Sequence, residues 1–206
     1  LQLFFHNHMN NLVKIFCMFG FFLTLPIILL SLIAVWFEDG LPLVFVQKRL
    51  GENKKEFNLF KIRTMYKSTP NLGTHEVDKI HHLKFGTIIR KLKIDELPQV
   101  INFIIGDINL IGPRPGLINQ ERLKHYREKF NVYNSKPGIT GLAQVLGYDM
   151  SNPELLAMID DLYIKQKTTK LDIVIFLATF FSIFRKKLNQ KYGDNIQEFK
   201  DQLNYV

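Results

Sequence analysis

The sequence predicts a mostly helical α+β protein whose N-terminal segment is embedded in a membrane. Three observations lead to this fold class. Residues 15–37 form a run of 23 residues without a charge. Residues 43–48 and 56–62 have the composition of two short strands. Most of the remaining chain carries apolar residues at helical spacing.

The uncharged run is long enough to cross a bilayer, because a straight helix of its length covers about 35 Å and the hydrocarbon layer is about 30 Å thick. Pro26 lies in its middle and predicts a bend. Two topologies follow: a kinked spanning helix, or a re-entrant helix that breaks and returns to the same face. Re-entry leaves backbone groups to be satisfied at the break, for which the Thr24 hydroxyl is a candidate. Lys14 and the basic residues after the run favour two cytoplasmic ends.

The two strands enclose the polar stretch 49–55, which predicts a β-hairpin at the membrane surface. Residues 68–78 predict a loop, and residues 189–206 a polar, frayed terminus. Residues 171–184 are apolar but too short to span, so they form either an interfacial helix with a basic end or a core helix. The other expected helices are 78–92, 97–105, 116–130 and 153–166.

The charge balance is basic, with 27 Lys and Arg against 19 Asp and Glu. A net charge of +8 suits nucleic acid, anionic headgroups or phosphate-bearing substrates. No nucleic-acid recognition module is present, and the apolar segment has no place in one, so we expect no nucleic-acid partner.

Asp95 and Glu96 stand just before the apolar stretch that follows Pro98, which favours a first helical turn. A plain explanation is that both residues stabilise a helix N-terminus. A chemical explanation is that an ionised carboxylate beside a divalent cation attacks phosphorus. Nearby positive charges, including Arg90, support the second explanation.

Two stiff basic turns are candidate phosphate contacts. In residues 112–116, Pro113 and a second proline flank Arg114 and hold its guanidinium in place for bidentate contacts. Residues 136–141 form the second turn. Lys61 and Arg63 at the end of the second strand could also contact phosphate or headgroups. A solvated turn or strand edge is the alternative explanation of each of these features.

The ordered series of these motifs resembles the monotopic phosphoglycosyl transferases, the bacterial sugar transferase family, in its minimal form. The resemblance covers about residues 13–184. It rests on stretches 45–51, 60–65, 90–99, 106–107, 110–115, 136–145, 160–163 and 171–172. The chain departs from the family pattern at Cys17, at Leu25 before the proline, and at Tyr148.

The resemblance implies that Asp95 attacks the β-phosphate of a UDP-sugar, that UMP leaves, and that polyprenyl (undecaprenyl) phosphate takes the phosphosugar from the aspartyl intermediate. This is the first membrane step of capsule, O-antigen, exopolysaccharide or glycoprotein glycan assembly. It further implies Mg²⁺ at Asp95, support from Glu96, and phosphate binding by Arg90 and Arg114, with Asp172 near the site. We expect a monotopic protein on the cytoplasmic face of the bacterial inner membrane, in contact with membrane lipids and downstream glycosyltransferases.

The resemblance also favours re-entry over spanning. We expect a single domain of residues 1–206, with a re-entrant membrane helix (1–40), a catalytic core (41–187) and a C-terminal tail (188–206). Two alternatives remain: a membrane phosphatase or phospholipid synthase, for which no motif is found, and a non-catalytic membrane-associated binding or scaffold protein. The identity of the sugar is not predicted.

Overall fold

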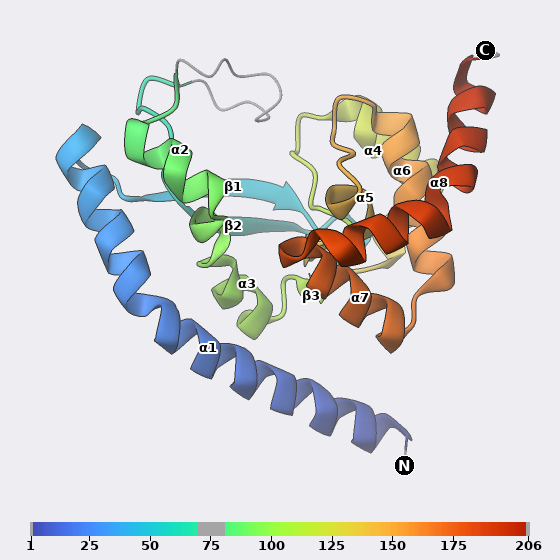
Figure 1. Cartoon of the computed structure of the whole chain (residues 1–206), viewed down its shortest axis with the longest axis horizontal. Coiled ribbons are helices and arrows are strands. Elements are labelled where there is room, and N and C mark those ends of the chain that lie inside the picture. Colours follow the sequence, from blue (N-terminus) through green and yellow to red (C-terminus); the bar gives the residue numbers. More distant parts are fainter. Residues whose placement is uncertain (1, 70–80, 205–206) are drawn as a thin grey trace. The chain divides into compact units, whose positions relative to one another are not determined.

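A computed structural model describes residues 2–69 and 81–204 of the chain (Figure 1). Its internal contacts divide the chain into two compact units. The first unit comprises Leu1–Gln47 and Asn58–Gly106, and the second comprises Lys48–Phe57 and Asp107–Val206. The expected loop at 68–78 and the start of the helix expected at 78–92 lie largely outside the described residues.

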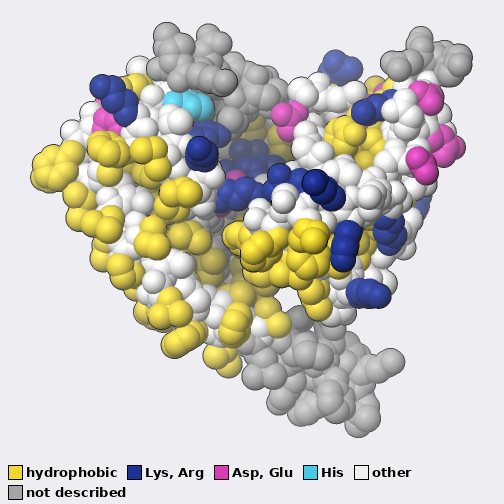
Figure 2. All heavy atoms as spheres, viewed as in Figure 1, with side chains coloured by type: hydrophobic (Ala, Val, Ile, Leu, Met, Phe, Trp, Pro, Cys, Tyr) yellow, Lys and Arg dark blue, Asp and Glu magenta, His cyan; other side chains and the backbone are white. Residues whose placement is uncertain are grey.

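Helix α1 (Gln2–Asp39) contains the whole uncharged run and continues through Pro26 (Figure 1). The ribbon bends along its length, as a proline inside a helix predicts. Its described apolar side chains are mostly exposed, and they form the apolar band over α1 in Figure 2. By length and composition, Val13–Asp39 could cross a membrane. The long apolar helix of the predicted fold class is confirmed, while re-entry stays a prediction.

The Thr24 hydroxyl does not bond the carbonyl four residues before the proline. Pro26 lacks the N–H that would bond the Phe22 carbonyl, whereas Thr24 Oγ1 donates to the Phe21 carbonyl at 2.8 Å. Ser31 Oγ makes a similar bond to the Ile27 carbonyl at 2.8 Å. The helix therefore uses its hydroxyls on neighbouring backbone carbonyls on either side of the proline.

The predicted β-hairpin is confirmed. Strands β1 (Val44–Leu50) and β2 (Glu56–Ile62) form a two-stranded sheet, joined by the 3₁₀ turn η1 (Glu52–Lys54). Both strands are rich in the aromatic and β-branched residues that favour extended structure.

The first unit continues with helix α2 (Lys84–Lys91), the 3₁₀ turn η4 (Ile94–Glu96) and helix α3 (Gln99–Ile105). Its core contains side chains from the membrane helix itself. The buried members are Ile28, Val35, Ile62, Leu83 and Ile89. Helix α1 is therefore part of this unit's core along one stripe, although most of its surface is exposed.

The second unit contains a short parallel sheet, in which β3 (Asn109–Ile111) pairs with β4 (Gly138–Thr140). Its helices form one large apolar core. They are α4 (Glu121–Lys129), α5 (Leu142–Val145), α6 (Pro153–Gln166), α7 (Thr169–Phe180) and α8 (Ser182–Asn204), with the 3₁₀ turn η5 (Val132–Asn134) after α4.

Helix α6 has the predicted bounds, because Asn152 caps it by accepting the Leu155 N–H at 3.2 Å and proline occupies its first turn. Helix α4 starts later than predicted, at Glu121. The apolar stretch 171–184 is divided between α7 and α8 at Phe181, where the backbone is extended. Leu171 and Ile175 on α7 are buried, which confirms a core role for one face. Ile173 and Phe176 are exposed, so membrane contact by the other face stays a prediction.

The frayed terminus predicted for residues 189–206 is wrong over the described part. Helix α8 runs to Asn204, and Leu188, Tyr192 and Ile196 are buried in the core of the second unit. These residues are four apart and therefore share one face of the helix. The stripe is narrow among many charged residues, which is why the average polarity of the segment hid it.

Candidate active site

Asp95 lies buried in the short turn η4, with 6% of its surface exposed. Helix α2 ends at Lys91, and Lys93 then takes a left-handed conformation (φ 58°) that reverses the chain. The Lys93 N–H donates to the Arg90 carbonyl at 3.0 Å, and the Glu96 N–H donates to the Lys93 carbonyl at 3.3 Å. The predicted position of both carboxylates ahead of helix α3 is confirmed. The turn is separate from that helix, whose N-cap is Pro98.

The neighbours of the carboxylate pair pack against the membrane helix. Ile94 and Leu97, on either side of the pair, join the apolar cluster that contains Ile28 and Val35 of α1. Asp95 therefore sits in a segment whose position depends on packing against α1. A polar residue becomes buried here because the apolar residues beside it in sequence are drawn into the core.

Lys61 and Glu96 form an ion pair between strand β2 and turn η4. Lys61 Nζ lies 3.2 Å from Glu96 Oε1, and the two side chains are only 16% and 15% exposed. A pair this sheltered is less screened by salt than a surface pair, although desolvation offsets part of the attraction. The structure thus brings together two of the predicted site residues beside Asp95.

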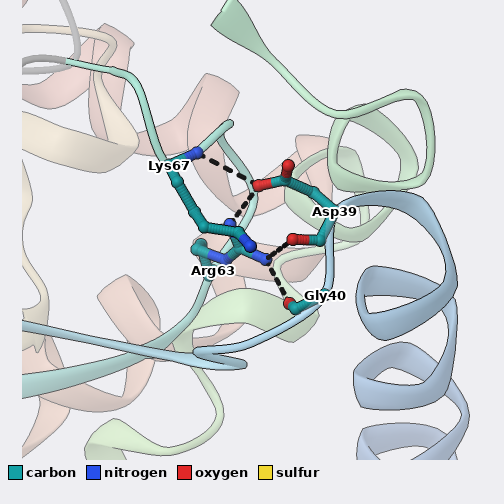
Figure 3. A network of polar contacts seen from close by, with 4 residues as sticks. All are labelled: Asp39, Gly40, Arg63 and Lys67. Atoms are coloured by element: carbon teal, nitrogen blue, oxygen red, sulfur yellow. Dashed lines mark hydrogen bonds and ion pairs between the residues drawn. The ribbon is translucent and has the colours of Figure 1, made fainter.

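Arg63 is buried and bonded to the end of the membrane helix (Figure 3). Its Nη1 pairs with the Asp39 carboxylate, and its Nη2 donates to the carbonyls of Asp39 at 3.2 Å and Gly40 at 2.6 Å. The Lys67 N–H donates to the same carboxylate at 3.1 Å. Contact between Arg63 and phosphate stays a prediction, and the observed bonds give its guanidinium a different set of partners.

Asn102 is a buried polar residue that the sequence did not single out. Its Nδ2 donates to the Asn58 carbonyl at 2.7 Å, and its Oδ1 accepts the Phe60 N–H at 3.1 Å. These bonds connect α3 to strand β2 and so connect the segments that carry Glu96 and Lys61. An asparagine within an apolar helical stretch was the available signal.

In the second unit, the two stiff turns predicted from sequence lie backbone against backbone. The Gly112 N–H donates to the Thr140 carbonyl at 3.0 Å, and the Gly138 N–H donates to the Pro113 carbonyl at 2.9 Å. A Cβ on Gly138 would meet Gly112 N at 2.1 Å, so only glycine permits this approach. Pro113 is buried and Arg114 is partly buried.

Strand β1 reinforces the double-proline turn. Arg49 Nη1 donates to the Pro115 carbonyl at 3.0 Å, and the Leu50 N–H donates to the Gly116 carbonyl at 3.0 Å. Arg114 is thus carried by a turn that is held on both sides by backbone hydrogen bonds. Such a turn provides the fixed presentation that the flanking prolines predict.

Asp172 lies in the first turn of α7 and accepts a hydrogen bond from Tyr163 Oη at 2.7 Å. Burial, together with the hydrogen bond and charge of Asp172, raises the pKa of Tyr163 well above its ordinary value. The phenol therefore stays protonated and keeps donating. Tyr163 Oη also lies 3.4 Å from the Ile111 carbonyl, at the start of the turn that carries Arg114.

Asp160, the first residue of the 160–163 motif, forms a buried ion pair with Arg127 at 2.6 Å. Burial raises the pKa of Asp160, and the Arg127 charge and hydrogen bonds oppose this rise. This pair connects α4 to α6 inside the core and has a structural place.

The predicted site residues fall into two groups. Those in the first unit are Lys61, Arg63, Arg90, Asp95 and Glu96, and those in the second unit are Pro113, Arg114 and Asp172.

Among the side chains that the structure describes (residues 13–69 and 81–203), no group of three or more His, Cys, Asp or Glu residues is placed to hold a metal ion. Two adjacent carboxylates nevertheless fit Mg²⁺, which commonly takes one or two carboxylates and completes its shell with water and substrate phosphates.

Helix α1 exposes most of its apolar surface, and its buried stripe packs against the residues on either side of Asp95. These features define a membrane-associated protein whose candidate site lies beside the membrane segment. Residues 5–186 match the family described as bacterial sugar transferase. The chain belongs to this family.

Three relatives illustrate the similarity. The chain is 39% identical to the "Uncharacterized sugar transferase EpsL" of Bacillus subtilis (strain 168), over 76% of this chain and 77% of that protein. It is 33% identical to the "UDP-N-acetylgalactosamine-undecaprenyl-phosphate N-acetylgalactosaminephosphotransferase" of Aeromonas hydrophila, over 77% of this chain and 39% of the relative. It is also 33% identical to the "UDP-glucose:undecaprenyl-phosphate glucose-1-phosphate transferase" of Xanthomonas campestris pv. campestris, over 79% of this chain and 36% of the relative. The matched part is well under half of the last two proteins.

Proposed function

We propose that this protein transfers a sugar-1-phosphate from a UDP-sugar to polyprenyl phosphate through a covalent intermediate on Asp95. The burial of Asp95 in a turn packed against the membrane helix is the observation that carries the proposal. Membership of the bacterial sugar transferase family supports it, as do relatives whose names specify undecaprenyl-phosphate acceptors and sugar-phosphate transfer.

In the first step, an Asp95 carboxylate oxygen attacks the β-phosphorus of the UDP-sugar. The bond between that phosphorus and the bridging oxygen breaks, and UMP leaves with the oxygen and its electron pair. The phosphosugar remains bound to Asp95 as an acyl phosphate. Lys61 beside Glu96 supplies positive charge near the diphosphate, and Arg90 and Arg114 are the further candidate phosphate ligands.

In the second step, a phosphate oxygen of the polyprenyl phosphate attacks the same phosphorus. The acyl phosphate bond breaks, the Asp95 carboxylate is restored, and polyprenyl diphosphosugar is released. Glu96 would accept a proton from the acceptor phosphate when that phosphate arrives protonated. Division into two steps allows the soluble donor and the lipid acceptor to bind in turn.

Asp95, with Glu96 beside it, would hold Mg²⁺ together with the phosphate oxygens of the donor. When bound, this ion would lower the negative charge that the attacking carboxylate meets at the diphosphate. The protein itself contributes the buried position of Asp95 and the nearby cations.

We place this reaction on the cytoplasmic face of the bacterial inner membrane, with α1 re-entrant and membrane lipids around it. A candidate site beside the membrane helix lets the lipid acceptor react without leaving the bilayer. The product would pass to downstream glycosyltransferases that extend a surface or secreted glycan. Labels placed at Cys17 and near residue 2 can be probed from each side of sealed vesicles. Re-entry predicts that they are reached from the same side as the catalytic core, and spanning predicts the opposite side.

The deciding experiment compares Asp95→Asn with the wild type in UMP release across a panel of UDP-sugars, with polyprenyl phosphate in detergent or nanodiscs. We expect the variant to lose UMP release by at least 10³-fold, since loss of a nucleophile removes the reaction path. Asp194→Asn on the exposed face of α8 is the matched control and should keep wild-type activity.

Mass spectrometry of the wild type mixed with donor alone should find the protein heavier by one phosphosugar. Retained turnover in a folded Asp95→Asn protein contradicts the assignment of the nucleophile. Hydrolysis without transfer to lipid indicates a phosphatase, and binding without turnover of any donor indicates a scaffold.

A further inference from the structure

We propose that Asp39 and Arg63 form a clamp that positions the Asp95 turn relative to the membrane helix, so that Arg63 is a positioning residue in the transfer reaction. This inference rests on the proposed function for its kinetic consequences. The geometry itself lies entirely within the first unit of the chain.

The clamp closes on the last residue of the membrane helix. Gly40 follows α1 in a left-handed conformation (φ 62°), and its N–H donates to the Trp36 carbonyl at 2.8 Å, which ends the helix. The chain leaves the helix there, so the Asp39 and Gly40 carbonyls are open to Arg63 (Figure 3). One planar guanidinium thus binds the Asp39 side-chain carboxylate and the backbone carbonyls of Asp39 and Gly40. Arginine suits this arrangement because its donors lie in one plane.

Glu38 makes a second attachment one residue earlier. Its carboxylate accepts the backbone N–H groups of Lys84 and of Phe85, the latter at 3.0 Å. These are the first N–H groups of α2, which have no partner within the helix. The negative charge also suits the positive end of the helix dipole. The acidic pair that ends α1 therefore attaches to the residue that follows β2 and to the start of α2.

These two elements lead directly to the candidate catalytic turn. Helix α2 ends at Lys91, four residues before Asp95, and strand β2 carries Lys61, which pairs with Glu96. The apolar cluster below them joins Ile62 and Ile89 to Val35 of α1. The clamp thus adds polar contacts to the same elements that the apolar cluster packs together. That cluster includes Ile94 and Leu97 on either side of the carboxylate pair.

The alternative role for Arg63, a direct phosphate ligand, makes the opposite kinetic prediction. A guanidinium that binds donor phosphate would be set free by Asp39→Asn, so that this change would leave or improve donor affinity. A guanidinium that acts through Asp39 loses its role in the same variant. Asp39→Asn therefore separates the two roles more clearly than any change at Arg63.

The test measures kcat and KM for UMP release in Asp39→Asn, Arg63→Met and the double variant, all as full-length protein in nanodiscs. We expect each variant to lower kcat by about tenfold or more and to change the donor KM by less than twofold. The double variant should be no slower than the slower single variant, because the two changes remove the same contact. Arg63→Lys should keep more of the rate than Arg63→Met, since lysine keeps the positive charge but lacks the planar guanidinium.

A matched control comes from the other end of the same hairpin. Lys48 and Glu56 pair at 3.2 Å but are 67% and 49% exposed. The combined Lys48→Met and Glu56→Gln change removes an ion pair of the same chemistry and should leave kcat and KM unchanged.

A readout that does not need turnover separates the clamp from the proposed function. Trp36 is the only tryptophan of the chain and lies within the last turn of α1. Acrylamide quenching of its fluorescence should change by at least 1.5-fold in Asp39→Asn and Arg63→Met, and remain as in the wild type in the control pair. If no UDP-sugar is turned over by the wild type, the proposed function fails and this readout still judges the clamp.

Two results overturn the clamp. One is a tenfold rise in donor KM for Arg63→Met with no effect of Asp39→Asn, which would make Arg63 a phosphate ligand. The other is unchanged Trp36 quenching in both variants, which would show that the end of α1 keeps its place without the pair.

Discussion

Tyr163 Oη donates a 2.7 Å hydrogen bond to Asp172 Oδ1, and so connects the middle of α6 to the first turn of α7. The same hydroxyl lies 3.4 Å from the Ile111 carbonyl, next to the turn that carries Arg114. The phenol is buried and its pKa is raised, so it donates throughout the range in which the protein is handled. Tyr163 thus orients an acidic residue that the sequence analysis assigned to the site.

Tyr163→Phe tests this orientation by removing only the hydroxyl. We expect UMP release to fall about tenfold, while the free energy of unfolding falls by about 1.5–3 kcal/mol, the usual contribution of one hydrogen bond to a charged group. Steady-state kinetics and thermal unfolding in detergent measure the two effects. If Asp172→Asn lowers the rate while Tyr163→Phe does not, the carboxylate works without this orientation.

Gly138→Ala tests the contact between the two stiff turns of the second unit. The added Cβ would meet Gly112 N at 2.1 Å, so the backbones must separate. We expect a loss of about 1–3 kcal/mol, the usual cost of overpacking, together with loss of turnover. Gly193→Ala in α8 is the matched control, because its Cβ would meet nothing within 4 Å. That change should stabilise the helix by about 0.5–1 kcal/mol. A Gly138→Ala protein as stable as the wild type would contradict the close approach.

Arg127→Met tests the buried ion pair and has a defined pH dependence. Asp160 is left without the cation that opposes the effect of burial, so its pKa rises further above its ordinary value. An acid whose pKa is raised in the folded state contributes most stability below its unfolded pKa, and this contribution is lost as the pH rises through the folded pKa. The destabilisation, about 3–5 kcal/mol near neutral pH, should therefore shrink at pH 5. Thermal unfolding of the variant at pH 5 and pH 8 measures this. Adding Asp160→Asn to Arg127→Met should remove most of this difference between pH 5 and pH 8. Equal melting temperatures at both pH values for Arg127→Met alone would contradict the expected pH dependence.

Tyr192→Ala tests the packing of the C-terminal helix. Tyr192 is buried, and its hydroxyl donates to Gln166 Oε1 at 3.2 Å. We expect the free energy of unfolding to fall by about 3–5 kcal/mol, as for other buried aromatic truncations. Asn195→Ala, at an exposed position of the same helix, should cost less than about 0.5 kcal/mol. Equal melting temperatures for the two variants would contradict the buried position of Tyr192.

Much of the local structure could be predicted because local signals agreed. The uncharged run, the hairpin and helix α6 each carry their own pattern and caps, and all three are found in the structure. Helix α8 was missed because its buried stripe consists of single residues four apart among charged ones. Its burial depends on the core that it meets, and no single segment contains that information.

The same distinction applies to the candidate site. Residue identity and spacing already provide the chemical groups: the adjacent carboxylates Asp95 and Glu96, the proline-flanked Arg114, and a membrane helix of sufficient length. Their partners depend on the folded arrangement of the chain. Arg63 pairs with Asp39, Lys61 pairs with Glu96, and Tyr163 donates a hydrogen bond to Asp172. Composition and spacing specify which side chains can donate, accept or carry charge. Which of them meet depends on packing between segments that are distant in the chain, because burial requires each polar group to find a partner there.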